Sequence, residues 1–127
     1  LKSLPLCGKG TDPDEVFFSI LQPGQKIPPH YGLSNHSLTV HLGIKVPEFC
    51  NLKVDGIQYE WEEGEVVVFD DSYIHQAENL SDETRVVLLF SIWHPSLSAL
   101  EIEAIKRTFT ARHDWLEARQ LPLVKDD

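Results

Sequence analysis

His30 is the first residue in the chain whose type and position could do chemistry. It stands in the run PPHYG, after two prolines, at a position where a metal ligand would be placed. A histidine that binds a metal usually has a second ligand two residues away, but that position is Gly32, which has no side chain. Three interpretations follow: an inactive site, a histidine with a packing role, or a metal centre with open coordination positions.

A second histidine follows a comparable pattern further along the chain. Gly24 is followed by five residues and then His30, and Gly64 is followed by five residues, the run DDSYI and then His75. Both spacings resemble the two signature segments of the cupin superfamily, whose fold is a double-stranded β-helix or jelly roll. In that resemblance Gly32 replaces the second histidine of an HxH pair and the downstream glutamate is absent. His30 and His75 are then the expected metal ligands.

The ligand types indicate which metal chemistry such a site would support. Neutral imidazole binds Zn, Cu, Fe and Ni, and two histidines with one carboxylate are typical of non-heme Fe(II) oxygenases. A closed structural zinc site needs four ligands, and two more with plausible spacing are not found. Gly32 in place of an acid removes one ligand and one negative charge but leaves a position for water or substrate. The pattern favours an open metal site.

Three polar residues in apolar strands suggest an organic ligand beside the metal. Arg85 begins the apolar run VVLLF, where a guanidinium is costly unless a carboxylate or similar partner meets it. His41 shares one face of its strand with Thr39, opposite Leu38, Val40, Leu42 and Ile44, so it is expected to point into the barrel. Ser19, between Phe18 and Ile20, is expected to do the same. The bound ligand could supply the missing partner of Arg85.

The elements that must position these side chains are short strands between turn signals, which is typical of an all-β sandwich or barrel. Asp55-Gly56 predicts a tight hairpin, and Pro28-Pro29 predicts a turn. A helix is expected over residues 98–119, with Ser98 and Glu101 as a capping box and an amphipathic face that packs on the sheet. The strands are expected at residues 16–21, 38–44, 50–54, 58–61, 66–69, 73–77 and 85–93.

Length and composition restrict the class of protein. A chain of 127 residues predicts one domain, spanning 1–127, with a jelly-roll core over about 16–95. The formal charge of −9 argues against nucleic acid as a partner. No apolar run approaches the roughly 18 residues of a membrane span, so a soluble domain is expected, with a cytoplasmic location favoured. The chain has no Met, even at position 1, which predicts a trimmed N-terminus or a piece of a larger protein. Cys7 and Cys50 are expected to be unpaired thiols with packing roles.

Four longer stretches carry a closer resemblance. The runs PGQKIPPHYGLSN, HLGIKVP, WEEGEVVVFDDSYIH and LFSIWHP resemble the aspartyl/asparaginyl β-hydroxylase family of Fe(II)- and 2-oxoglutarate-dependent oxygenases. The resemblance covers about residues 16–95, and FDDSxxH with a downstream HP is its most specific part. That family is similar in having two histidine ligands and a glycine where related enzymes have an acid. The resemblance therefore favours the open metal centre.

The resemblance implies a role for each site residue. His30 and His75 would hold Fe(II), Arg85 and Ser19 would bind the distal carboxylate of 2-oxoglutarate, and His41 would bind its other end. Asp71 would orient a water molecule at the metal. With O₂ as cosubstrate, 2-oxoglutarate would be decarboxylated to succinate while an unactivated C–H bond is hydroxylated. Trp61 and Phe69 are expected to be framework residues.

One departure from the family concerns the substrate. Peptidyl members commonly have arginines in the strand before HLG, whereas this chain has Ser37 and Thr39 there, with His36 as a weaker, pH-dependent substitute. The leading expectation is hydroxylation of the β-carbon of an aspartyl or asparaginyl residue, or of a related peptide or small amino-acid-like substrate. Two alternatives stay open: a cupin enzyme with another metal and no 2-oxoglutarate, and a non-catalytic module that binds the cosubstrate.

Overall fold

The computed structural model describes residues 5–8 and 16–119. Within these residues there are eight strands and one helix. The strands are β1 (Phe17–Leu21), β2 (Lys26–His30), β3 (Ser37–Lys45), β4 (Cys50–Val54), β5 (Ile57–Tyr59), β6 (Val66–Phe69), β7 (His75–Asn79) and β8 (Arg85–Trp93), and the helix is α1 (Ala99–Ala118).

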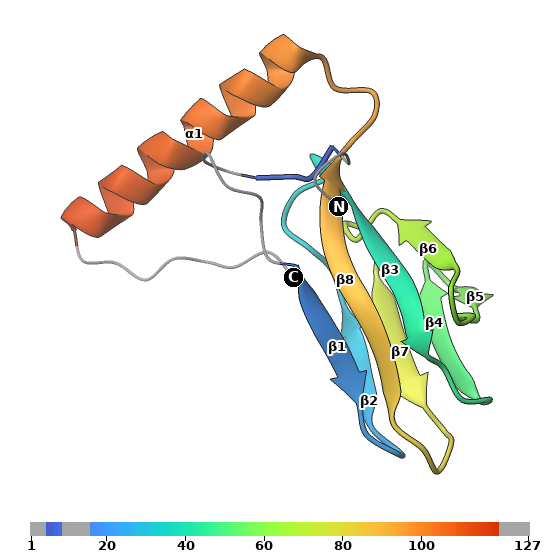
Figure 1. Ribbon diagram of the computed structural model, residues 1–127. Coiled ribbons are helices and arrows are strands. Elements are labelled where there is room, and N and C mark those ends of the chain that lie inside the picture. The colour runs from blue at the N-terminus through green and yellow to red at the C-terminus, as the bar shows by residue number, and fades with distance from the viewer. Residues whose placement is uncertain (1–4, 9–15, 120–127) are drawn as a thin grey trace.

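The strands form two antiparallel four-stranded sheets that pack face to face (Figure 1). One sheet has the order β1-β8-β3-β6 and the other has the order β2-β7-β4-β5. Consecutive strands therefore often lie in opposite sheets, as in a jelly roll. The predicted all-β jelly roll with a C-terminal helix is confirmed, and the arrangement brings the His30 strand beside the His75 strand.

The space between the sheets is filled by apolar side chains. Leu21, Leu52, Trp61, Phe69 and Val87 are all buried there and pack in one cluster. Each of the aliphatic and aromatic side chains stabilises the fold by roughly 1.5–3 kcal/mol through its removal from water. This core surrounds the few polar side chains that point inward.

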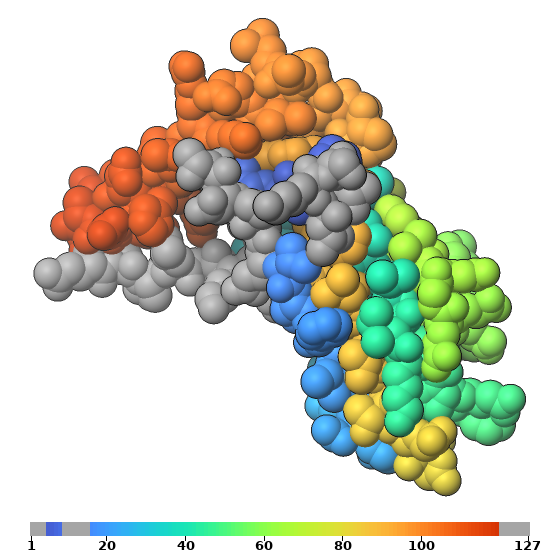
Figure 2. Space-filling model, viewed as in Figure 1, coloured from blue at the N-terminus to red at the C-terminus, as the bar shows by residue number. Residues whose placement is uncertain are grey.

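The alternation along β3 places its two faces as the sequence predicts. Thr39 and His41 are buried on the inner face, whereas Leu42 and Ile44 lie on the outer face and are partly or largely exposed. On the neighbouring strands the outer face also carries apolar side chains. Figure 2 shows β1, β8, β3 and β6 side by side at this surface. Exposed apolar side chains on it include Phe18, Ile20, Val66 and Val68.

A tight turn and a close approach of the backbone each require particular residues. Asp55 and Gly56 have φ of +49° and +80° and join β4 to β5, so the predicted tight hairpin is confirmed. At Gly43, a Cβ atom would lie 2.2 Å from the carbonyl oxygen of Glu62. Only glycine lets β3 and the segment before β6 approach this closely. Gly43 N–H also donates to the Glu65 carbonyl at 3.0 Å.

The expectation of a turn at Pro28-Pro29 is wrong, because both prolines lie in β2. β2 is an edge strand, and its pairing with β7 is irregular between Ile27 and His30. Proline lacks an N–H donor and is tolerated in a sheet only at such edges and irregularities. The segment before His30 is therefore a strand in which few backbone N–H groups are needed for pairing, so the prolines are tolerated.

The helix begins as predicted but packs differently. Ser98 Oγ accepts the Glu101 N–H at 3.1 Å and Glu101 accepts the Ser98 N–H at 3.0 Å, which confirms the capping box. However, no residue of α1 is buried, and Figure 1 shows the helix projecting from the end of β8. The prediction that it packs along a sheet is wrong. Leu100 and Trp115 lie off the stripe formed by the other apolar positions and are 81% and 51% exposed.

Smaller differences concern strand ends and cysteines. β7 begins at His75 rather than at residue 73, and β5 ends at Tyr59, two residues before Trp61. Cys7 and Cys50 are both buried thiols that do not pair with each other, as predicted. Among the described residues, no helix is both long enough and apolar enough to cross a membrane.

Candidate metal centre

His30 and His75 face each other across two neighbouring strands. They are register partners in the β2–β7 pair, and their ring centroids lie 4.2 Å apart with the ring planes tilted by 56°. His75 is buried and His30 is half-buried. Two residues 45 positions apart in the sequence thus present imidazoles to one small volume, as the sequence analysis expects.

The hydrogen bonds of both rings have the same pattern. Nδ1 of His30 donates to the Pro28 carbonyl at 3.0 Å, and Nδ1 of His75 donates to the Tyr73 carbonyl at 2.9 Å. Because a carbonyl can only accept, Nδ1 carries the proton in each neutral ring and Nε2 carries the lone pair. This is the arrangement in which a backbone carbonyl orients a metal-binding histidine. The site therefore presents two Nε2 atoms suited to one divalent cation.

The backbone near the pair joins the two motif segments directly. Gly32 is buried, and its N–H donates to the Asp71 carbonyl at 2.8 Å. Asp71 itself is half-buried, and this backbone bond places it beside the His30 segment. Asp70 instead caps a turn, since its Oδ1 accepts both the N–H and the Oγ–H of Ser72 at 2.9 and 2.6 Å.

His41 is a buried, neutral imidazole further inside the barrel. Its Nδ1 accepts the indole N–H of Trp61 at 3.1 Å. Burial, followed by electrostatic interactions with Arg85 and then His75, lowers the pKa of His41 to about 3. The Phe69 ring lies between the histidines, with its centroid 5.1 Å from that of His41 and 5.2 Å from that of His75. His41 thus lies near His75, a candidate metal ligand, with the Phe69 ring in contact with both.

Arg85 is the most deeply buried charged side chain described, at 1% exposure. Its Nη2 donates to Ser19 Oγ at 2.8 Å and to the Ser19 carbonyl at 3.1 Å, and its guanidinium carbon lies 4.4 Å from the centre of the Trp61 ring. Its Nε is buried without a hydrogen-bond partner among the described residues. Burial lowers the pKa of Arg85 to about 10. Within the described part of the chain, Arg85 is therefore a buried cation without a carboxylate partner.

A buried asparagine holds the loop that leads into Arg85. The side-chain amide of Asn79 donates to the Leu21 carbonyl at 3.1 Å and to the Glu83 carbonyl at 2.7 Å. Its Oδ1 accepts from the Ser81 hydroxyl at 2.6 Å and from the Cys50 thiol at 3.2 Å. This side chain is fully buried, so it links β1, β4 and β7 to the start of β8.

The remaining polar candidates have different surroundings. His36 is buried, with its ring 5.6 Å from Trp93 and 5.3 Å from Phe109, and its Nδ1 meets Ser34 Oγ, so its position is a packing one. Ser37 and Thr39 are both buried on β3. They give the inner face of that strand hydroxyl groups and no charge.

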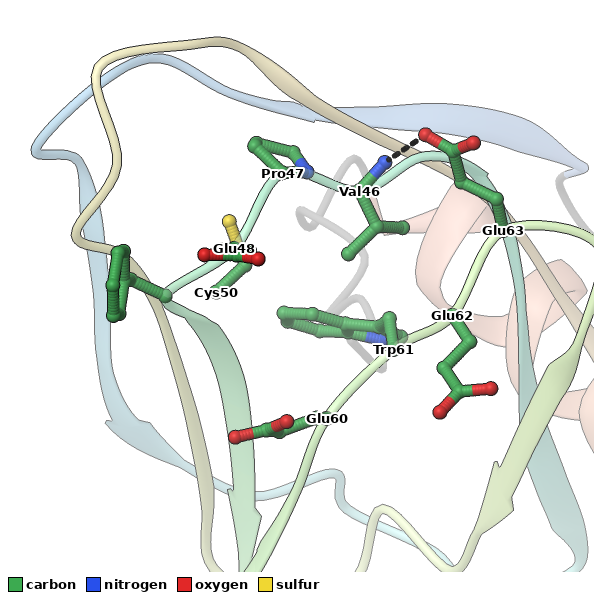
Figure 3. Close-up of a pocket in the computed structure, with 9 residues that line it drawn as sticks. Val46, Pro47, Glu48, Cys50, Glu60, Trp61, Glu62 and Glu63 are labelled. Atoms are coloured by element: carbon green, nitrogen blue, oxygen red, sulfur yellow. Dashed lines mark hydrogen bonds between the residues drawn. The ribbon is translucent and has the colours of Figure 1, made fainter.

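A pocket of about 330 Å³ lies beside this cluster and contains none of the histidines. Its wall includes Trp61, with Val46 above the indole and Glu60 and Glu62 on either side of it in the chain (Figure 3). Trp61 is therefore shared between the pocket and the interior residues His41 and Arg85. The prediction that Trp61 is a framework residue did not include these contacts. A tryptophan N–H that is buried needs an acceptor, and that requirement was the available signal.

Comparison with solved structures defines the class of fold. A Cupin_2 domain of an XRE family transcriptional regulator from Enterobacter cloacae superposes with a TM-score of 0.54 at 19% identity, over 62% of this chain and 80% of that one. A cupin protein from Bacteroides fragilis gives a TM-score of 0.54 at 18% identity, over 66% and 69% of the two chains. The protein is thus a cupin-like barrel with a pair of interior-facing histidines.

Sequence comparison places the chain within this class. The family description Aspartyl/Asparaginyl beta-hydroxylase matches residues 1–95, and the chain belongs to that family.

Relatives in the family have names that refer to different substrates. Aspartate beta-hydroxylase domain-containing protein 2 of Mus musculus is 40% identical over 94 residues, which are 72% of this chain and 27% of the relative. Aspartyl/asparaginyl beta-hydroxylase of Homo sapiens is 35% identical over 66% of this chain and 11% of its own length. Ornithine lipid ester-linked acyl 2-hydroxylase of Rhizobium tropici is 43% identical over 63% of this chain and 30% of its own. The chain spans less than a third of each relative.

Proposed function

We propose that this protein is an Fe(II)- and 2-oxoglutarate-dependent dioxygenase that hydroxylates a C–H bond, with its strands and helix forming one oxygenase domain. The observation that carries the proposal is the buried Arg85, which has no carboxylate partner in the described ranges 5–8 and 16–119, in the same barrel interior as the facing pair His30 and His75. A cation so placed needs an anionic partner, and the two imidazoles suit a metal. A metal together with an anionic cosubstrate accounts for both features.

The histidine pair fits a ferrous ion by the chemistry of its donors. His30 and His75 would hold the metal through Nε2, because both Nδ1 atoms are committed to backbone carbonyls. Gly32 contributes no third ligand, so positions stay available for cosubstrate and water. When bound, the iron supplies the oxygen chemistry that side chains cannot perform. The residues of this chain orient the ligands around it.

The cosubstrate is a dicarboxylate, and the interior has a partner for each end. Arg85 and Ser19 would bind the distal carboxylate, since Arg85 Nε lacks a partner and Ser19 already orients the guanidinium. His41, with its proton on Nε2, would donate to the carboxylate nearer the metal. Phe69, whose ring contacts both His41 and His75, would exclude water between the two ends. Asp71, half-buried beside the histidine segments, would hold a water molecule there.

The substrate side of the site is less charged than the cosubstrate side. Ser37 and Thr39 give β3 hydroxyl groups, so an acidic substrate would find no cation at those two positions. We infer that the substrate is an aspartyl or asparaginyl residue hydroxylated at its β-carbon, or a related peptide or small amino-acid-like molecule. The name of the human relative supports this choice, whereas the name of the Rhizobium tropici relative keeps a lipid acyl chain as an alternative.

The function is tested by an anaerobic titration with Fe(II) and 2-oxoglutarate, followed by admission of oxygen. A metal-to-ligand charge-transfer absorption band and then succinate formation are expected. His75→Ala should abolish both, and His113→Ala, which changes an exposed histidine of α1, should change neither. Metal-dependent activity that is indifferent to 2-oxoglutarate would instead show another kind of cupin enzyme. Cosubstrate binding without succinate would show a binding module.

A further inference from the structure

Trp61 lies where it can influence both residues proposed to bind the cosubstrate. It follows β5, is 4% exposed, and forms part of the wall between the pocket of Figure 3 and the barrel interior. Its indole has one hydrogen-bond donor and no acceptor. The N–H at the ring edge donates to His41, and the ring face contacts the guanidinium of Arg85.

The hydrogen bond from Trp61 determines the tautomer of His41. Because the indole N–H donates to His41 Nδ1 at 3.1 Å, Nδ1 must carry the lone pair. A neutral imidazole has a single proton, which is then on Nε2. No other hydrogen bond of His41 is present among the described residues, so Trp61 alone selects this form. Without the indole N–H, either nitrogen could carry the proton.

The ring of Trp61 also restricts Arg85. The guanidinium carbon lies 4.4 Å from the ring centroid, within the range of a cation–π contact, while Nη2 is held by Ser19. A guanidinium fixed at one face and one nitrogen has little rotational freedom. Its unpartnered Nε is thereby kept in one orientation.

We propose that Trp61 is a positioning residue that makes His41 an Nε2–H donor and holds Arg85 in place. Both residues are then already oriented to bind the two ends of the cosubstrate. The inference rests on the proposed function for the identity of the ligand, and it adds that one indole controls both contacts. A residue with only a framework role would fill volume without selecting a tautomer.

The first test needs no variant and no cosubstrate. Long-range ¹⁵N–¹H spectra of the histidine side chains at neutral pH report which ring nitrogen carries the proton. His41 is expected as the Nε2–H tautomer in the wild-type protein, with its assignment made by loss of the signal in His41→Gln. An Nδ1–H tautomer in the wild-type protein would overturn the proposal.

The second test separates the N–H from the ring. Trp61→Phe keeps an aromatic face for Arg85 but removes the donor, whereas Trp93→Phe makes the same change at a buried tryptophan whose ring contacts His36. Trp61→Phe is expected to give mixed His41 tautomers and about a tenfold weaker 2-oxoglutarate affinity in the anaerobic Fe(II) protein. Trp93→Phe is expected to leave both unchanged. An unchanged tautomer and affinity in a folded Trp61→Phe protein would contradict the proposal.

A double variant shows whether the effect passes through His41. If it does, Trp61→Phe adds less than a twofold loss of affinity when His41 is already Gln. Fully multiplicative losses would refute the assigned path. If the wild-type protein does not bind 2-oxoglutarate, the proposed function fails, while the tautomer spectra still decide whether Trp61 orients His41.

Discussion

Replacement of Arg85 by methionine should separate stability from cosubstrate binding. The side chain is 1% exposed, and burial lowers its pKa from 12.5 to about 10. That change corresponds to a cost of about 3 kcal/mol for holding the charge in the apo protein. Methionine removes this cost but also loses the two hydrogen bonds to Ser19, each worth roughly 1.5 kcal/mol for a charged donor. The two contributions nearly cancel.

The free energy of unfolding of Arg85→Met should therefore stay within about 1.5 kcal/mol of wild type, although a fully buried residue is changed. Binding should respond very differently. Loss of the buried partner of a carboxylate leaves that charge uncompensated and costs about 3–5 kcal/mol. At about 1.4 kcal/mol per factor of ten, 2-oxoglutarate affinity should fall by a factor of about 100 to 4,000.

Urea unfolding of the apo protein measures the first quantity, and anaerobic titration of the Fe(II) protein with 2-oxoglutarate measures the second. Arg112→Met, which makes the same change at an exposed arginine of α1, serves as the control. It should alter neither quantity. Wild-type affinity in a folded Arg85→Met protein would refute the assignment of Arg85 as the carboxylate anchor.

Three further predictions concern the scaffold. Gly43→Ala should lower the free energy of unfolding by about 3 kcal/mol, because the added Cβ would lie 2.2 Å from the Glu62 carbonyl oxygen. Gly24→Ala should lower it by only about 1 kcal/mol, because a Cβ there has nothing within 4 Å and only the φ of +77° is unfavourable. Equal losses in urea unfolding would contradict this reasoning. Asn79→Ala should cost about 3 kcal/mol in the same assay, since groups on four other residues lose a partner and the bonds to Leu21 and Cys50 are buried; a loss below 1 kcal/mol would argue against this network. His41 has a folded pKa of about 3, so between pH 6.5 and 3 the unfolded state binds a proton that the folded state does not, and stability falls as the pH falls. Between pH 7 and 5 the wild-type protein should lose about 2 kcal/mol more than His41→Gln, whereas equal losses would show that His41 is protonated in the fold.

Local sequence signals predicted most of the elements. Strands with alternating or continuous apolar character, such as β3 and β8, were located to within a residue or two, as was the capping box that starts α1. The exceptions are informative. β2 contains Pro28 and Pro29 and was expected to be a turn, because local propensity cannot show that the strand lies at a sheet edge with little need for donors. The prediction of how α1 packs was also wrong, because an amphipathic pattern does not specify which surface the helix contacts.

Motif spacing identified His30 and His75, whereas the faces and apolar surroundings of their strands pointed to Ser19, His41 and Arg85. The structure brings these residues into one interior. What spacing could not show is how they are oriented. The shared use of Trp61 by His41 and Arg85 joins residues 20 and 24 positions away from it through side-chain contacts. No periodicity or spacing rule encodes such a contact.

The amino-acid sequence by itself determined the residue types, the inward or outward face of positions in strands such as β3, and the family to which the chain is similar. These follow from covalent order and from the two-residue repeat of a strand, which act over short distances. Only the tertiary structure decided that the centroids of two imidazole rings lie 4.2 Å apart and that a buried guanidinium has no carboxylate partner among the residues described. Those properties depend on which strands become neighbours and on how deeply each group is removed from water, and both arise only when the two sheets close on one another.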